Sequence, residues 1–390
     1  MHRVWQSDPS LHAPARYNRA CEYDAFVPLP LADLRLSLPG AIAAVVSDAE
    51  AAIAALNHAA GPELAPLARL LLRTESIASS KVEGMQVDAS TLARAEANQE
   101  TGRRIGPDAA EILANIDAMQ LAIERASSLG GVGPQDLVDV HRVLLLRAPN
   151  AQIAGRLRTS QNWIGGNNYN PCGAAFVPPP PDEVERLLED LCRFSNQEDL
   201  PALVQAAIAH AQFETIHPFD DGNGRTGRAL VQVVLRRRGL APAFVPPISV
   251  ILAREKDTYI EGLTLFREDR IPEWLETFAV AASRAAGLAI RYTKRVADIQ
   301  AGWRQQLRDY SNPRSDSAAW AIIDVLPGHP IVTVPIAVAS TKRARSAVFT
   351  AVEELKEAGV LKPLSQSSRN RAWEAEGLLD LIVELESSIG

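Results

Sequence analysis

The residues best suited to chemistry lie close together in the stretch from His217 to Arg228. Within it are one imidazole, two carboxylates, three glycines and two guanidinium groups. An imidazole exchanges a proton near neutral pH, a carboxylate offers hard oxygen ligands to Mg²⁺, and a guanidinium pairs with phosphate oxygens. This combination indicates a site that handles a phosphate-containing ligand.

Two helices must hold this stretch in place. Residues 202–216 lack Gly and Pro and are rich in Ala and in apolar residues at helical spacing, which predicts a buried helix. Residues 225–238 carry a broad apolar stripe and end in three arginines before Gly239, as a second helix would. A glycine-rich loop that opens a helix presents unpaired N–H groups and the positive end of the helix dipole. The pattern therefore predicts an anion site.

Two other phosphate-binding loops share part of this pattern. The three glycines match the spacing of a dinucleotide-binding loop, and residues 222–228 nearly match a P-loop. Both of those loops follow a β-strand, whereas a helix precedes this one, and Arg228 and Ala229 replace the P-loop Lys and Ser/Thr. A loop with an Asx turn and no ligand is the remaining alternative.

The stretch resembles the motif of the Fic family at every specified position. The matching residues are His217, Phe219, Asp221, Gly222, Asn223, Gly224, Arg225 and Arg228. The resemblance extends over roughly residues 10–300. It implies a mainly α fold and an enzyme that moves AMP from ATP to a hydroxyl group of a protein.

Each residue type suits one part of that reaction. His217 is the expected general base, which accepts the hydroxyl proton, and Asp221 is the expected Mg²⁺ ligand beside the α- and β-phosphates. Phe219 is expected to anchor the loop in the core, and Asp220 occupies a free position of the motif and has no assigned role. The residues expected to hold the phosphates are Gly222, Asn223, Gly224, Arg225 and Arg228.

A second informative string ends the helix predicted from Leu64 to Glu83. Ser79, Glu83 and Gly84 resemble the inhibitory motif of Fic proteins. A carboxylate can form a bidentate pair with a guanidinium, so Glu83 is expected to compete with the γ-phosphate of ATP for Arg228. The alternative is a solvated glutamate at a helix end.

The composition is that of a folded protein of about two to three domains. A net charge of -7 and a sequence pI near 5.6 exclude nucleic-acid binding over the whole surface and leave only a local basic patch. Three cysteines, Cys21, Cys172 and Cys192, argue against a disulfide framework or a zinc site and favour a cytoplasmic location. No membrane span is expected, because Asp and Pro residues interrupt the apolar run 320–339.

The chain is expected to fold in three parts. Residues 1–40 form a Pro-rich arm packed on the core, residues 41–310 form the Fic core with its inhibitory helix and flap, and residues 311–390 form a C-terminal domain. His141 and His210 are interpreted as packed helix residues. The helices predicted in the core, besides those around the motif, are 41–59, 64–83, 108–128, 134–147, 182–194 and 272–289.

The segment from Gly155 to Pro181 does not fit a helix. It contains two adjacent glycines and four consecutive prolines, which favours a short β-hairpin. By the resemblance it corresponds to the flap that lines the target site, where a strand edge could align a target segment by main-chain pairing. An ordinary surface hairpin is the alternative.

The C-terminal domain resembles a winged helix. Three helices are predicted at residues 316–326, 333–341 and 344–358, followed by a small hairpin. Such modules bind DNA, dock proteins or form homodimers, and all three options stay open. The basic residues expected on one face are Lys342, Arg343, Arg345, Arg369 and Arg371.

The expected function is therefore that of a protein adenylyltransferase restrained by Glu83. It would use ATP and Mg²⁺ to modify a Ser, Thr or Tyr hydroxyl of a target protein, and the enzyme itself is one candidate target. Within the enzyme class, the alternative is a hydrolase that removes AMP from a modified protein, with Glu83 positioning water. The alternative outside that class is a nucleotide-sensing, DNA-binding regulator.

Overall fold

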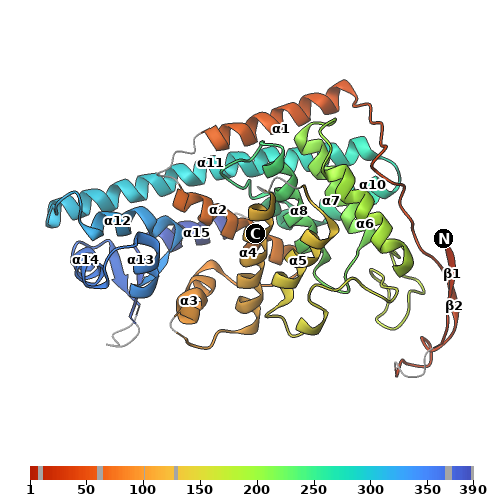
Figure 1. Ribbon diagram of the computed structural model, residues 1–390, viewed down its shortest axis with the longest axis horizontal. Coiled ribbons are helices and arrows are strands. Elements are labelled where there is room, and N and C mark those ends of the chain that lie inside the picture. Colours follow the sequence, from red (N-terminus) through yellow and green to blue (C-terminus); the bar gives the residue numbers. More distant parts are fainter. Residues whose placement is uncertain (8–11, 59–64, 101, 127–130, 365–370, 388–390) are drawn as a thin grey trace.

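The computed structural model describes residues 1–7, 12–58, 65–100, 102–126, 131–364 and 371–387. Its elements are mainly helical, as predicted, and the longest helix runs along most of the molecule (Figure 1). The helices of the core are α1 (Gly40–His58), α2 (Ala65–Val82), α3 (Ala89–Glu100), α4 (Pro107–Ala126), α5 (Pro134–Leu145), α6 (Pro181–Ser195), α7 (Ala202–Ile216), α8 (Asn223–Arg237), α9 (Ile248–Arg254), α10 (Lys256–Arg267) and α11 (Ile271–Tyr310).

Helix α7 forms the centre of the core, and every one of its residues is buried. Its bounds are those predicted from the sequence, because an unbroken apolar run without Gly or Pro is a clear helical signal. Helix α8 packs beside it and begins at Asn223, two residues before the predicted start. The helices predicted around the motif are therefore confirmed.

Helix α11 is 40 residues long, and the predicted helix 272–289 covers only its first half. The second half is rich in charged residues, but Tyr292, Val296, Trp303 and Leu307 recur at helical spacing and are buried. They pack in one apolar cluster with residues of the C-terminal segment. The prediction stopped too early because this sparse stripe needs a tertiary partner to be recognised.

Helix α1 lies along α11 and is long and apolar enough, by length and composition alone, to cross a membrane. Its buried residues, among them Val46, Ala49 and Ile53, recur every three or four positions and mark one face. Asp48 and Glu50 interrupt the apolar sequence near its middle. This one-sided burial is that of a helix laid on a protein core.

The N-terminal arm contains an antiparallel pair of strands, β1 (His2–Trp5) and β2 (Cys21–Asp24). Cys21 forms a disulfide with Cys172 of the flap, and their Cα atoms are 6.2 Å apart. The expectation against a disulfide framework did not foresee this bond. The two cysteines are separated by 151 residues in sequence, so their spacing carried no signal. The cysteine count accordingly gives no support for a reducing compartment.

The predicted flap hairpin is reduced to one antiparallel bridge between Ile164 and Phe176. Gly165 and Gly166 both adopt positive φ where the chain turns. The run of prolines from 178 to 181 has no backbone N–H groups to extend the pairing. Phe26 of the arm instead donates its backbone N–H to Val177 O at 2.8 Å, so the arm lies against the flap.

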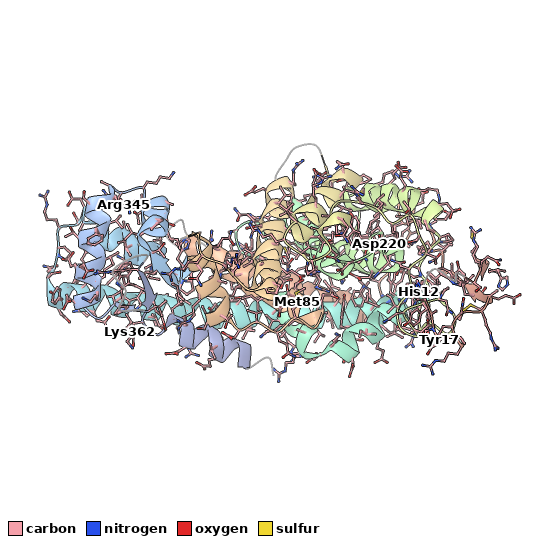
Figure 2. The ribbon with its side chains drawn as sticks, turned by 90° about the horizontal axis from the view of Figure 1, so that it is seen from below. His12, Tyr17, Met85, Asp220, Arg345 and Lys362 are labelled. Carbon is pink, nitrogen blue, oxygen red and sulfur yellow. A yellow bond between two sulfur atoms is a disulfide. The ribbon has the colours of Figure 1, made fainter. Side chains whose placement is uncertain are left out.

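Among its described residues, the C-terminal segment has the three predicted helices, together with a first strand and a last helix that were not predicted. Its three-stranded antiparallel sheet has the order β3-β5-β4. Arg345 lies in this unit, far along the molecule from Asp220 (Figure 2). The winged-helix assignment stays a prediction, and Arg369 lies outside the described residues. The elements are α12 (Ala318–Val325), β3 (Ile331–Thr333), α13 (Val334–Thr341), α14 (Arg345–Glu357), β4 (Leu361–Pro363), β5 (Ala372–Ala375) and α15 (Leu378–Ser387).

Candidate active site

His217 ends helix α7 in the left-handed conformation, with φ 49° and ψ 60°. This backbone turn points the chain into the glycine-rich loop. The Nδ1 atom lies 3.4 Å from the carbonyl oxygen of Glu214, an arrangement in which Nδ1–H donates and Nε2 keeps its lone pair. Burial lowers the pKa of His217 to about 4, so the imidazole is neutral at pH 7. It is therefore in the form that accepts a proton.

The loop after His217 is held by Asn223 at the start of α8. Its Oδ1 accepts the backbone N–H of Phe219 at 2.9 Å, and its Nδ2 donates to Phe219 O at 2.8 Å. Phe219 is fully buried, as expected for a core anchor. The side chain of Asn223 is thus used within the loop, which leaves its backbone at the helix N-terminus for an anion.

Gly224 lies in the first turn of α8, directly beneath the carboxylate of Glu83. A Cβ atom at this position would collide with Glu83 Oε1 and would lie 2.9 Å from Arg228 Nη1. Only a residue without a side chain allows such a close approach. The carboxylate of Glu83 therefore lies against the first turn of α8, where the sequence predicted an anion site.

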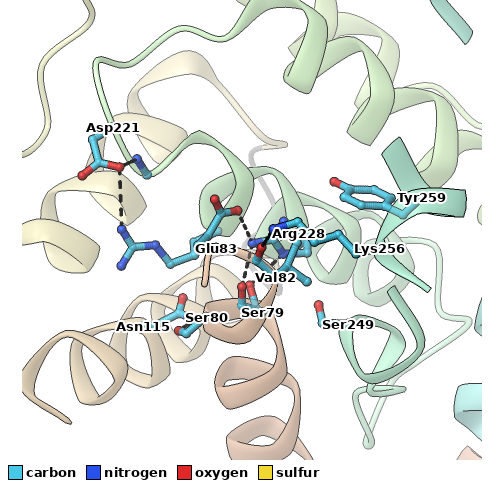
Figure 3. A network of polar contacts seen from close by, with 12 residues as sticks. Ser79, Ser80, Val82, Glu83, Asn115, Asp221, Arg228, Ser249, Lys256 and Tyr259 are labelled. Atoms are coloured by element: carbon cyan, nitrogen blue, oxygen red, sulfur yellow. Dashed lines mark hydrogen bonds and ion pairs between the residues drawn. The ribbon is translucent and has the colours of Figure 1, made fainter. Parts of the chain in front are cut away.

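Arg228 lies deeper on the same helix, with 2% of its surface exposed. Its Nε donates to Ser79 Oγ at 2.8 Å, and its Nη2 donates to Ser79 O at 2.8 Å and to Glu83 Oε1 at 2.7 Å (Figure 3). Burial would raise the pKa of Glu83, but the guanidinium groups of Arg228 and, to a smaller extent, Arg225 hold that pKa below its usual value. The structure thus brings Ser79 and Glu83 of one sequence motif into contact with Arg228 of the other.

Helix α2 ends immediately before Glu83, and Gly84 continues the chain with φ 88°. Lys256 donates to the carbonyl oxygen of Val82 at 2.7 Å, and Asn115 on α4 donates to Ser76 O at 2.8 Å. These contacts come from two other helices of the core, α10 and α4. They fix the helix end that carries Glu83.

Asp221 extends from the loop toward solvent, and 51% of its side chain is exposed. Its Oδ2 accepts from Asn150 Nδ2 at 2.7 Å, and its Oδ1 accepts the N–H of Gly222 at 2.6 Å. Within the described ranges, no three His, Cys, Asp or Glu side chains gather as a metal cage. One oriented carboxylate fits Mg²⁺, which often binds one or two protein carboxylates together with substrate phosphates and water.

Arg225 is almost fully buried between the loop and helix α4. Its Nη1 lies 3.5 Å from Glu111 Oε2, and its Nη2 lies 3.9 Å from Asp221 Oδ1. The two acidic neighbours hold the guanidinium beside the anion site. Arg225 and Asp221 therefore lie on one side of the loop, as a site for a metal and a polyphosphate requires.

Arg158, at the start of the flap, is a residue that the sequence did not single out. Its Nε donates to the backbone oxygen of His217 at 2.8 Å, and its Nη2 donates to Ile216 O at 3.3 Å. The backbone N–H of Arg158 donates to Pro218 O at 3.0 Å. Arg158 thus holds the backbone around His217, and nothing in its local sequence indicated this.

The sequence analysis did not single out Glu214, although it is the one charged residue of the buried helix predicted at 202–216. Burial raises its pKa to about 7 in the vicinity of Arg228. His210, one turn earlier, has its Nε2 2.9 Å from the Tyr259 hydroxyl and lies fully inside the core. The interpretation of His210 as a core residue agrees with this position.

Comparisons with known proteins agree with the sequence resemblance. Residues 132–235 match the Fic/DOC family and residues 43–124 match the Fic/DOC family N-terminal region. Protein adenylyltransferase fic-1 of Caenorhabditis elegans is 35% identical over 114 residues, which are 28% of this chain and 20% of that protein. Protein adenylyltransferase Fic of Drosophila melanogaster is 27% identical over 212 residues, 53% of this chain and 40% of that protein. The chain thus spans less than half the length of these relatives.

Solved structures share the fold. A Fic family protein from Desulfovibrio desulfuricans superimposes with a TM-score of 0.52 and 20% identity, and the match covers 90% of this chain and 99% of that one. A Fic domain containing signaling protein from Bacteroides thetaiotaomicron also gives a TM-score of 0.52 at 20% identity, over 64% of this chain and 97% of that one. These structures show the fold, and the family matches over residues 43–124 and 132–235 agree with the resemblance read from the motif.

Proposed function

This chain carries the core and the N-terminal region of the Fic/DOC family, and from that premise we propose that it is a protein adenylyltransferase. Its reaction would transfer AMP from ATP to a Ser, Thr or Tyr hydroxyl of a protein. The observation that supports this best is the position of a neutral imidazole, His217, one short loop before a helix N-terminus that carries Arg225 and Arg228. The names of the relatives point the same way.

In the proposed step, the hydroxyl oxygen forms a bond to the α-phosphorus of ATP. The bond from that phosphorus to the oxygen bridging to the β-phosphate breaks, and pyrophosphate leaves. The hydroxyl proton passes to the imidazole of His217. Arg225, Arg228 and the N–H groups at the start of α8 hold the phosphate oxygens. Mg²⁺ held by Asp221 would neutralise charge on the phosphates when bound.

We further propose that Glu83 restrains this reaction. Its carboxylate lies in the anion site at Gly224 and pairs with Arg228 at 2.7 Å, which is the place and the partner that a terminal phosphate needs. ATP would then bind with its α-phosphate out of line for attack. The resting rate would be low until this carboxylate moves away.

Two labels on ATP test the proposal. The full chain is incubated with Mg²⁺ and ATP labelled at either the α- or the γ-phosphate, with itself and cell-extract proteins as acceptors. AMP transfer predicts that the α-label enters protein and the γ-label does not. Incorporation of the γ-label would indicate phosphorylation and contradict the proposal. Release of AMP from a pre-modified protein, without forward transfer, would establish the hydrolase alternative.

The C-terminal unit supports a second proposal, a winged helix that binds DNA. Its elements follow the order helix, strand, helix, helix, strand, strand, helix, and Lys342, Arg343 and Arg345 are exposed where α13 leads into α14. Titration of a labelled DNA duplex tests this by fluorescence anisotropy. Binding that weakens with salt and on replacing the three residues by Ala supports it. Absence of binding at low salt refutes it and leaves protein docking.

A further inference from the structure

His141 on helix α5 joins two segments that both border the site. The residue is fully buried, and its ring lies between the motif loop and the start of the flap. Its Nε2 lies 3.0 Å from the backbone oxygen of Asp221. Its Nδ1 lies 3.0 Å from the backbone nitrogen of Gly155. One side chain therefore contacts the loop at Asp221 and the flap at Gly155.

These two contacts determine which nitrogen of His141 carries the proton. The backbone N–H of Gly155 can only donate, so Nδ1 must accept. The proton is then on Nε2, which donates to the Asp221 carbonyl oxygen. Both hydrogen-bonding positions of a neutral imidazole are thereby used, and burial lowers its pKa to about 4. The ring is a fixed link between two backbone segments.

The ring is also held by packing. It stacks on Phe219 with ring centroids 3.7 Å apart and an interplanar angle of 7°. A Cβ atom at Gly222 would lie 3.4 Å from its Cδ2 atom, so the ring fits closely beneath that glycine. His141 thus contacts the loop on both sides of Asp221. These contacts leave the backbone of Asp221 little freedom.

The side chain of Asp221 is held by the segment that follows helix α5. Asn150, between α5 and the flap, donates to the Asp221 carboxylate at 2.7 Å. The segment that follows α5 therefore orients the carboxylate, and His141 holds the carbonyl group of the same residue. The backbone of His217, in contrast, is held by Arg158. The two ends of the loop have separate supports.

We propose that His141 is a positioning residue, which aims the Asp221 carboxylate at the metal-bound polyphosphate while anchoring the start of the flap. The inference rests on the proposed function, because the orientation of the Asp221 carboxylate matters only if that carboxylate binds a metal–nucleotide complex. Loss of the link to Asp221 should weaken nucleotide binding only when Mg²⁺ is present. Partners that orient a metal ligand typically contribute about 10- to 100-fold in metal affinity.

Two isosteric variants separate the two hydrogen bonds. In His141→Gln the amide nitrogen takes the place of Nε2 and keeps the bond to Asp221, but the bond to Gly155 is lost. In His141→Asn the amide oxygen takes the place of Nδ1 and keeps the bond to Gly155, but the bond to Asp221 is lost. Each variant loses one hydrogen bond and the stacked ring, so their thermal unfolding should change alike.

The readout is binding of a fluorescent ATP analogue to the full-length protein in the His217→Ala background, which prevents turnover. Affinity is measured with Mg²⁺ and with a chelator. We expect His141→Asn to lower the Mg²⁺-dependent gain in affinity by about tenfold or more, and His141→Gln to keep it within about threefold. Equal changes in both variants, or an unchanged gain in His141→Asn, would overturn the inference.

The proposed function can fail separately. If the His217→Ala background binds the nucleotide equally with and without Mg²⁺, or the chain with His217 intact transfers no AMP, the proposed function is wrong, and with it the basis of the inference. If the background shows the gain and the chain with His217 intact transfers AMP, but both His141 variants keep the gain, only the inference is wrong.

Discussion

Replacing Glu83 by Gly should activate the protein. The change removes the carboxylate that lies at Gly224 and frees the Arg228 guanidinium for a phosphate. Hydrogen bonds to charged groups contribute about 1.5 to 3 kcal/mol. Because 38% of the Glu83 side chain is exposed, water screens the pair, and the lower end of about 1.5 kcal/mol applies. That free energy corresponds to about a tenfold gain in the productive pose of ATP.

The assay is incorporation of α-labelled AMP at saturating ATP and Mg²⁺. Glu83→Gly should raise the initial rate about tenfold. The matched control is Glu83→Gln, which keeps the size of the side chain but removes its charge, and which should give a smaller rise. The double variant Glu83→Gly with His217→Ala must stay inactive if the gain runs through the proposed base. An unchanged rate in Glu83→Gly would refute the inhibitory role of Glu83.

Three further outcomes follow from the structure. Burial lowers the pKa of His217 to about 4, so its base form is lost only as the pH falls through that range. The value of kcat/KM should therefore decline near pH 4, and a decline centred near pH 6.5 would contradict this. Gly227→Ala places a Cβ atom 2.6 Å from Glu214 Oε1, so it should lower the stability measured by thermal unfolding by about 1 to 3 kcal/mol. The control Gly302→Ala has open space around its Cβ atom and should not destabilise the fold. Reduction of the Cys21–Cys172 disulfide should lower stability by about 2 to 4 kcal/mol, and an unchanged Tm after reduction, with both thiols titratable, would argue against the bond.

The sequence was most informative where chemistry and local pattern coincide. The bounds of α7 followed from its apolar run, and the pairing of Glu83 with Arg228 was expected from the resemblance of residues 79–84 to the inhibitory motif of Fic proteins. The first depends on a strong local preference, and the second depends on a short motif whose carboxylate suits a guanidinium. The prediction that the two motifs meet is confirmed by a 2.7 Å contact.

Long-range contacts between irregular segments could not be read in the same way. The disulfide joins residues 151 positions apart, and Arg158 reaches the backbone of His217 from the flap. Every residue has a backbone carbonyl oxygen, so the sequence does not show which one a side chain will bind. His141 was correctly interpreted as packed, but its role in holding the loop depends on two such backbone contacts.

The central claim is that His217 accepts the proton in AMP transfer, and one comparison tests it most directly. In His217→Ala, binding of ATP is measured by calorimetry and incorporation of the α-label is measured on the same sample. Loss of a general base should lower the rate by about 10²- to 10⁴-fold while the affinity for ATP stays near that of the parent. A variant that binds ATP normally and still transfers AMP at nearly the parental rate would contradict the account.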